Sequence, residues 1–214
     1  MGSSLLLFWA MRIGGVKKMK RLSKIKVSVY IATSLDGYIA REDGDIGWLH
    51  EGEEPGEIEE FAEGQESGDV EDAGYGDFFN SIDILVMGRG SFEKVLEFDP
   101  WPYGAKPVIV LSKSMTEVPE KLRNTVRIDI STPHELVEKL TQEGYRHIYL
   151  DGGKVIQSFL REGLVDEMTL TIIPVLIGNG IPLFGKIEKD IKLKLLESRS
   201  WEYGFVQSMY QVLK

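Results

Sequence analysis

The sequence has no cysteine and only three histidines among its 214 residues. Without cysteine the chain forms no disulfide, offers no thiolate nucleophile and has no thiolate ligand for zinc. His50, His134 and His147 lack the spacing of a histidine metal motif, so we expect no metal site. Long hydrophobic runs are also missing. The apolar stretch from Leu5 to Met11 is too short to cross a bilayer, so we expect no membrane-spanning segment.

Basic residues are absent from residues 42–88, which contain 16 of the 34 acidic residues. The rest of the chain therefore carries all 25 Lys and Arg, and it is compatible with an anionic ligand despite the net charge of −9. No basic stripe with interleaved aromatic residues occurs, so we expect no nucleic-acid partner. Residues 51–68 have few apolar side chains, and we expect an acidic insert that is mobile and dispensable for folding.

The first 24 residues do not have the order of a secretory signal, because the lysines follow the apolar run instead of preceding it. We expect residues 1–24 to be an extension or a start-site artefact outside the fold, with Met19 as a second possible start. A weak membrane-surface anchor is the alternative. Residues 25–214 are expected to form one domain of a cytoplasmic protein.

Strands and helices are expected to alternate along most of the chain. Apolar and β-branched runs predict strands at residues 24–33, 83–87, 106–112, 124–130, 147–150, 165–177, 191–203 and 205–214. Helices are predicted at 72–82, 91–98, 131–144 and 152–163. The third helix has the clearest ends, since Thr132 and Glu135 can form a capping box and Gly144 can end the helix. Alternation that gives way to consecutive strands indicates an α/β fold with a mixed, mostly parallel sheet.

Three of the predicted strands end in similar turns, with the sequences GRGS (88–91), SKS (112–114) and DGGK (151–154). A helix N-terminus offers free N–H groups, and glycine lets an anion approach the backbone. Each turn alone is more often a purely structural turn. Because the ends of parallel strands gather at one edge of a sheet, the three together predict a polyphosphate ligand. We see neither a GxGxxG motif nor an acidic residue at a strand end that would bind a ribose.

Five segments follow one another over about residues 25–213: YIATSLDGYIA, GYGDFFNSIDILVMGRGSFE, PVIVLS, IYLDGGKVIQSFL and GLVDEMTLTIIPVLIGNGIPLF. In this order they resemble the reductase domain of riboflavin biosynthesis, and most closely its stand-alone members without a deaminase domain. The resemblance implies a dihydrofolate-reductase-like three-layer sandwich, with a mixed, mostly parallel central sheet and flanking helices. It also implies NADPH as cofactor and a homodimer, and the apolar C-terminal strands support a dimer through that region.

The resemblance assigns cofactor contacts residue by residue. The positions that match the family's phosphate-binding turns, its 2′-phosphate loop and its nicotinamide-facing residues are Gly88, Arg89, Gly90, Ser91, Ser112, Lys113, Gly152, Gly153, Lys154, Val155, Ala32 and Ile39.

On the substrate side, Trp48 resembles the tryptophan that covers the pterin pocket of dihydrofolate reductases, although it is equally typical of a packing anchor. A count back from Met87 places Asp72 where those enzymes carry the pocket carboxylate, and Asp77 is the neighbouring candidate. Asp36 matches an aspartate that the riboflavin-pathway enzymes share. The alternative is that it only shapes its turn. Thr171 lies on a strand that borders the pocket in the family.

The segment Asn179-Gly180 has the composition of a type I′ turn, and in the family this loop lies near the active cleft.

The function implied is an NADPH-dependent reductase for a pyrimidine or pterin-like heterocycle, of the 5-amino-6-(5-phosphoribosylamino)uracil reductase type. Dihydrofolate reductase activity and a non-catalytic NADPH-binding module are the alternatives.

Overall fold

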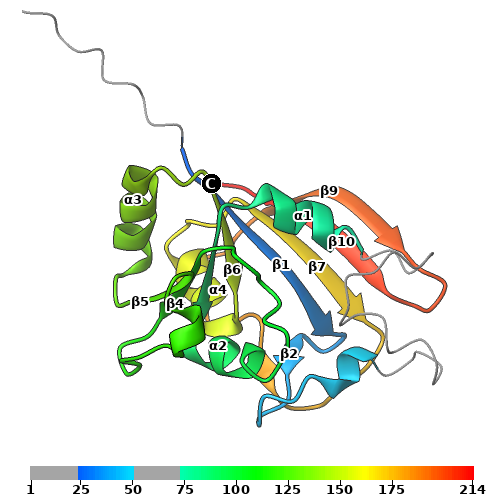
Figure 1. Ribbon diagram of the computed structural model, residues 1–214. Helices are drawn as coiled ribbons and strands as arrows, with labels where there is room; N and C mark the ends of the chain where they lie inside the picture. Colours follow the sequence, from blue (N-terminus) through cyan, green and yellow to red (C-terminus); the bar gives the residue numbers. More distant parts are fainter. Residues whose placement is uncertain (1–23, 51–72) are drawn as a thin grey trace, which may run out of the picture.

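One eight-stranded sheet runs through the middle of the molecule (Figure 1). The computed structural model describes residues 24–50 and 73–214. In chain order the strands of this sheet are β1 (Lys26–Ser34), β3 (Ile84–Gly88), β4 (Val108–Leu111), β5 (Val126–Asp129), β6 (His147–Asp151), β7 (Glu167–Ile173), β9 (Leu193–Ser200) and β10 (Val206–Val212). The helices are α1 (Tyr75–Ser81), α2 (Arg89–Val95), α3 (Pro133–Glu143) and α4 (Gly153–Arg161), with short 3-10 turns η1 (Gly47–His50) and η3 (Glu120–Leu122). Strands β2 (Tyr38–Ala40) and β8 (Ile181–Pro182) form a separate pair.

The strand order is β5-β4-β3-β6-β1-β7-β10-β9. The first six strands in this order are parallel, whereas β10 runs antiparallel to β7 and β9 antiparallel to β10. This sheet confirms the predicted α/β class and the predicted mixed, mostly parallel sheet.

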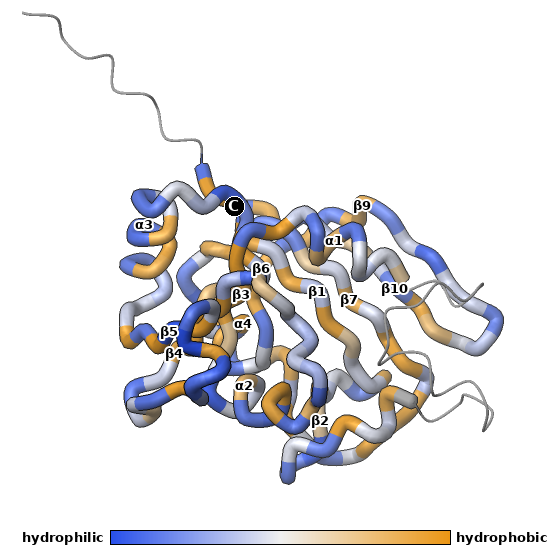
Figure 2. Tube along the Cα trace, viewed as in Figure 1, coloured by the Kyte–Doolittle hydropathy of each residue, from blue (hydrophilic) through white to orange (hydrophobic). Residues whose placement is uncertain are grey.

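Helices cover both faces of the sheet, and each face has its own apolar core. Side chains of α3 and α4 pack on one face against alternate residues of β1, β3 and β6. Side chains of α1 and α2 pack on the other face, together with aromatic residues of the 96–107 loop. In Figure 2 the central strands are mostly hydrophobic, as expected for strands that are covered on both faces.

Local sequence signals account for the ends of most elements. Thr132 and Glu135 form the predicted capping box of α3, and Gly144 ends this helix with φ 100°. Helix α2 starts at Arg89, two residues earlier than predicted, so that the predicted GRGS turn is the last residue of β3 and the first turn of α2.

The region after β7 differs from the prediction. The strand ends at Ile173, because Pro174 has no N–H to continue the ladder and the chain then turns away. The type I′ turn predicted at Asn179-Gly180 is wrong, since that turn needs positive φ at both residues and the positive φ lies at Gly178, at 75°. The short strand β8 was not predicted.

Strand β9 is the last strand of the sheet, and among the described residues no strand pairs with its outer edge. Leu193, Leu195 and Leu196 on this strand are 40%, 53% and 46% exposed. An apolar edge strand of this kind is typical of a surface that another chain covers.

We therefore predict that the protein is a homodimer through this C-terminal region, and that Leu195→Glu shifts it to monomer by introducing a charge into the interface. Sedimentation at micromolar concentration measures the change. The control is Ile130→Glu, because Ile130 is 70% exposed and follows β5 at the opposite edge of the sheet. An unmutated protein that sediments only as a monomer contradicts the prediction.

Candidate functional site

The turns that follow β3, β4 and β6 lie together at the carboxyl edge of the sheet. Gly88 at the end of β3 is opposite Leu111 of β4, and Met87 is opposite Asp151 of β6. Because the three strands are parallel and in register, the chain leaves each of them at the same edge. The structure therefore brings together the three turns that the sequence singled out.

The turn before α4 has room for backbone only. A Cβ atom on Gly152 would lie 2.3 Å from Ser91 Oγ, and one on Gly153 would lie 2.6 Å from the carbonyl oxygen of Pro182. Gly152 also has φ 84°, a conformation that disfavours other residues. The glycine turn is therefore packed tightly between Ser91 and the carbonyl of Pro182.

Arg89 connects the turn after β3 to the turn after β4. Its Nη1 donates to Ser114 Oγ at 3.2 Å, and its Nε lies 3.5 Å from the Glu93 carboxylate. Ser112 Oγ accepts from the backbone N–H groups of Ser114 and Met115, at 3.3 and 3.0 Å. A guanidinium and two hydroxyls thus share one small surface, a combination suited to phosphate oxygens.

Lys113 and Lys154 add positive charge next to these turns. Both side chains are exposed, and within residues 24–50 and 73–214 neither forms an ion pair. Gly90 faces open space, because a Cβ atom there would meet nothing within 4 Å. The edge is therefore open, cationic and lined by backbone.

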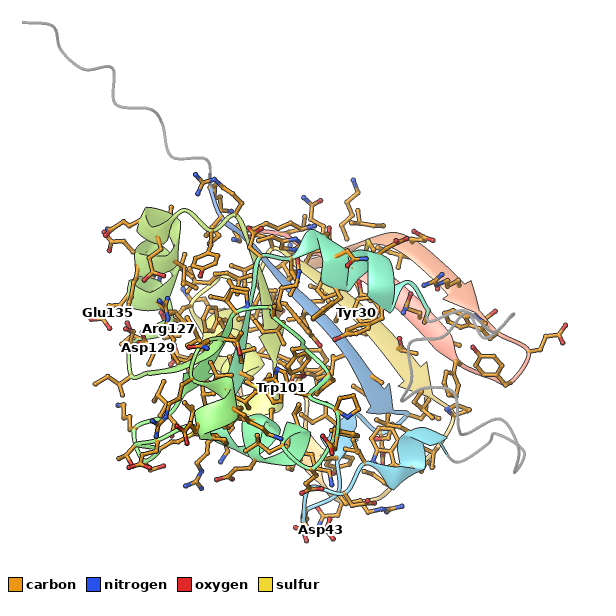
Figure 3. All side chains as sticks on the ribbon, in the orientation of Figure 1. Tyr30, Asp43, Trp101, Arg127, Asp129 and Glu135 are labelled. Carbon is orange, nitrogen blue, oxygen red and sulfur yellow. The ribbon has the colours of Figure 1, made fainter. Side chains whose placement is uncertain are left out.

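Two strands do end in acidic residues, contrary to our interpretation of the sequence. Asp129 ends β5 beside Ser112, whose N–H donates to the Asp129 carbonyl at 3.1 Å. Burial alone would raise the pKa of the Asp129 carboxyl, but hydrogen bonds from Lys139 and Ser131 lower it to about 2. Lys139 Nζ lies 2.6 Å from this carboxylate, so the acid is paired. In Figure 3 Asp129 lies beside Arg127 and Glu135 at the β5–α3 end of the sheet.

Asp151 is the second strand-end acid, and sequence reasoning missed its role although the segment LDGG was noted. It is half-buried at the end of β6, where it accepts hydrogen bonds from the Gly152 N–H and the Ser91 hydroxyl. Burial raises the pKa of the Asp151 carboxyl, and these two hydrogen bonds oppose the rise.

Three tyrosines are close enough to Asp151 for its charge to affect them. Burial raises the pKa of Tyr75, Tyr103 and Tyr149, and the nearby Asp151 charge raises each further. A carboxyl with a raised pKa therefore lies near three tyrosines and beside the glycine turn.

The residues matched to the nicotinamide lie on β1 and β2. Ala32 is paired with Thr171 of β7, near the carboxyl end of β1. Ile39 Cδ1 is 3.4 Å from the position that a Cβ atom on Gly153 would take. Val155, one turn into α4, lies 3.5 Å from the corresponding position on Gly88. These contacts place β2 and the start of α4 side by side.

Of the five candidates for the substrate side, the four in the described residues lie on different elements of the fold. Asp72 lies outside the described residues, so its role stays a prediction. Trp48 is fully buried, and its indole N–H has no hydrogen-bond partner in the part of the chain that the structure describes. Asp36 lies in the β1–β2 turn, and Asp77 lies in the first turn of α1.

The Thr171 hydroxyl is part of a polar network across the sheet. Gln207 Nε2 donates to Thr171 Oγ1 at 2.9 Å and to the Tyr30 hydroxyl at 2.8 Å, and Arg199 Nε donates to Gln207 Oε1 at 2.9 Å. Tyr30 and Arg199 both donate to the carbonyl of Ala73, just before α1. Tyr30 is labelled below α1 in Figure 3.

A groove of about 360 Å³ lies beneath α1 and contacts this network. It reaches Lys26, His147 and Glu167, near the amino ends of β1, β6 and β7. The groove is therefore on the same face as Asp151 but extends away from the edge that holds the three turns.

Comparison with known proteins identifies the family. The profile of the RibD C-terminal domain matches residues 25–206, nearly the whole described chain. The chain belongs to the RibD C-terminal domain family. Two members of similar length come from Bacillus subtilis (strain 168), and both are described as uncharacterized. YwjB is 34% identical over 172 residues, covering 79% of this chain and 88% of YwjB. YyaP is 29% identical over 202 residues, covering 88% and 96%.

Solved structures of RibD-like proteins share the fold. A protein from Shewanella sp. PV-4, provisionally described as a riboflavin biosynthesis protein, has TM-score 0.77 and 37% identity, and the match covers 89% of this chain and 100% of that one. The deaminase and 5-amino-6-(5-phosphoribosylamino)uracil reductase of Thermotoga maritima has TM-score 0.63 and 14% identity, covering 89% of this chain and 57% of its own. These shared folds confirm the predicted dihydrofolate-reductase-like sandwich.

No helix in residues 24–50 and 73–214 is long and apolar enough to cross a membrane. Nor does any group of three acidic or histidine side chains in those residues have the geometry of a metal site.

Proposed function

We propose that the protein is an NADPH-dependent reductase, of the 5-amino-6-(5-phosphoribosylamino)uracil reductase type, that transfers hydride to a pyrimidine or pterin-like heterocycle. The observation that carries the proposal is the contact between the three strand-end turns. Arg89 bridges two of them, and Gly152 of the third packs directly on Ser91. Family membership supports the reaction class.

The residues at this edge fit NADPH. Gly152 and Gly153 would let the pyrophosphate approach the amino end of α4, and Arg89, Ser112 and Lys113 would hold the 2′-phosphate. Lys154, Gly88, Gly90, Ser91 and Val155 would complete the wall, while Ala32 and Ile39 would face the nicotinamide. When bound, the cofactor supplies the hydride, and the protein supplies binding and orientation.

Reduction of a C=N or C=O carbon also needs a proton on the neighbouring atom. We assign this proton to Asp151, whose carboxyl is beside the glycine turn and has a raised pKa. Tyr75 and Tyr103 are close enough to Asp151 to feel its charge and would line the heterocycle with aromatic surface. The alternative of dihydrofolate reductase activity depended on Asp72 and on Trp48 covering the pocket, and the full burial of Trp48 does not favour it.

The test is a titration of the protein with NADPH, followed by NADPH oxidation against a panel of substrates. The panel holds the deaminated riboflavin precursor, dihydrofolate and simple pteridines. The proposal is supported if the protein binds NADPH and oxidises it in the presence of the precursor. If the protein binds NADPH but oxidises it with none of the panel compounds, a non-catalytic module is supported. A protein that does not bind NADPH overturns the assignment.

Gly153→Ala is predicted to weaken NADPH binding strongly, because its methyl group would lie 2.6 Å from the Pro182 carbonyl and must displace one of the two backbones. A shift of about 1 Å at a binding group costs on the order of a hundredfold. Calorimetric titration measures the loss. Gly47→Ala is the matched control, since its methyl group would meet only the Asp45 side chain, at 3.4 Å or more, in a segment outside the three turns. Equal affinities for the two variants would contradict the prediction.

A further inference from the structure

Asp36 lies in the turn between β1 and β2, but its carboxylate binds a segment that is distant in the sequence. Oδ2 accepts from the Gly178 N–H at 2.8 Å, and Oδ1 accepts from the Ile177 N–H at 3.3 Å. Ser34 Oγ donates to Oδ1 at 2.6 Å, which orients the carboxylate from within the turn. One side chain therefore satisfies two successive N–H groups of the loop that follows β7.

The segment held by Asp36 continues to the amino end of α4. Gly180 passes so close to β2 that a Cβ atom there would lie 2.2 Å from the Ala40 carbonyl oxygen. Two residues later the Pro182 carbonyl faces Gly153, at 2.6 Å from the position of a Cβ atom. These contacts connect the Asp36 carboxylate to the glycine turn through the six residues 177–182.

Gln157 binds the carboxyl-terminal end of the same segment. Its Nε2 donates to the carbonyls of Pro182 and Leu183, at 3.1 and 3.2 Å. Leu183 is fully buried in the core beneath α4. Residues 177–183 are therefore fixed by a carboxylate at one end and by an amide and a buried side chain at the other.

We propose that Asp36 is a positioning residue, which holds residues 177–182 against the amino end of α4 and so sets the width of the anion-binding turn at Gly152-Gly153. Only the identity of the anion as NADPH rests on the proposed function. The hydrogen bond from Ser34, together with those from the Gly178 and Ile177 N–H groups, lowers the pKa of the Asp36 carboxyl, so it is anionic near neutral pH. An anionic carboxylate with both oxygens occupied binds backbone and does not deliver a proton.

Hydrogen exchange of the protein without ligand tests whether Asp36 holds residues 177–182 in place. We expect Asp36→Ala to speed exchange at the Ile177 and Gly178 amides by about tenfold or more, because their bonds to an ionised acceptor are lost. Asp43→Ala is the matched control. Asp43 is an exposed carboxylate whose bond is local, to the Asp45 N–H at 3.0 Å, so its removal changes the charge equally and leaves residues 177–182 unchanged. Unchanged exchange in Asp36→Ala overturns the proposal, whatever the ligand.

NADPH affinity and turnover test the consequence. Asp36→Asn keeps the shape of the side chain, but one oxygen becomes an N–H₂ group that cannot accept from a backbone N–H. We expect this variant to bind NADPH about tenfold more weakly, with turnover at saturating NADPH changed little, because a displaced segment alters the binding turn before the chemistry. Lost turnover with unchanged affinity and exchange would make Asp36 a proton donor instead. A wild-type protein that binds no NADPH would refute the proposed function and leave the exchange result standing.

Discussion

Asp151→Asn is expected to lower turnover by about a hundredfold or more, with NADPH affinity changed little, since a positioned acid contributes on that order to a reduction. The asparagine keeps the size of the side chain and can still accept from the Gly152 N–H, but it has no acidic proton to give. Steady-state oxidation of NADPH with the best substrate of the panel measures the loss. Turnover equal to that of the unmutated protein would mean that water or the substrate supplies the proton.

The same substitution should make the protein more stable at neutral pH. The pKa of Asp151 is raised in the folded state, so its favourable contribution is present below the pKa of the unfolded chain and is lost as the pH rises through the folded pKa. Above that pH the folded protein holds an ionised carboxylate in a half-buried site, and asparagine removes this cost. Melting temperatures of the two proteins should therefore differ in neutral buffer and converge in acid. A gain in stability paired with a loss of turnover separates a catalytic role from simple damage to the fold.

Preference for NADPH over NADH is expected to be on the order of a hundredfold at low salt. Hydrogen bonds to charged groups contribute about 1.5–3 kcal/mol each, and exposure lowers this for Arg89, whose side chain is 53% exposed. Two such contacts, from Arg89 and Lys113, can together supply roughly 2.8 kcal/mol, the equivalent of a hundredfold in affinity. Asp129, at the end of β5 beside Ser112, is paired with Lys139 and repels the 2′-phosphate little.

Arg89→Ala and Lys113→Ala should each reduce this preference, and higher salt should reduce it in the unmutated protein. Arg89→Ala should also weaken the binding of NADH, because it removes the hydrogen bond to Ser114 that joins two of the turns. Arg127→Ala serves as a control, since Arg127 pairs with Glu143 on the far side of β5. Equal dissociation constants for NADPH and NADH would contradict the assignment of this turn.

The sheet could be predicted because its strands carry a local signal. Covered on both faces, β3, β4 and β6 appear in the sequence as continuous apolar runs, and each is followed by a glycine or hydroxyl turn. The capping box of α3 is equally local. The register that brings the turns to one edge is a consequence of parallel pairing, and it needed no knowledge of distant contacts.

The missed features depend on contacts between segments far apart in the chain. Strand β8 has two residues and forms because Gly180 and Pro182 pack on β2 and α4. No local sequence pattern predicts these contacts. The significance of Asp151 came from burial among tyrosines of α1, β6 and the 96–107 loop. The count that selected Asp72 assumed equal spacing before β3, and nothing in the sequence could test that assumption.

Both flanks of residues 51–72 are anchored in the scaffold. On one side Trp48 is fully buried, and on the other the Ala73 carbonyl accepts hydrogen bonds from Tyr30 and Arg199, with Ala73 held at φ 53°. Because the anchors belong to the fold, a different sequence or length between them would leave the strand-end turns in place. The span is therefore suited to vary between relatives, or in a selected library, while the strand-end turns keep their arrangement.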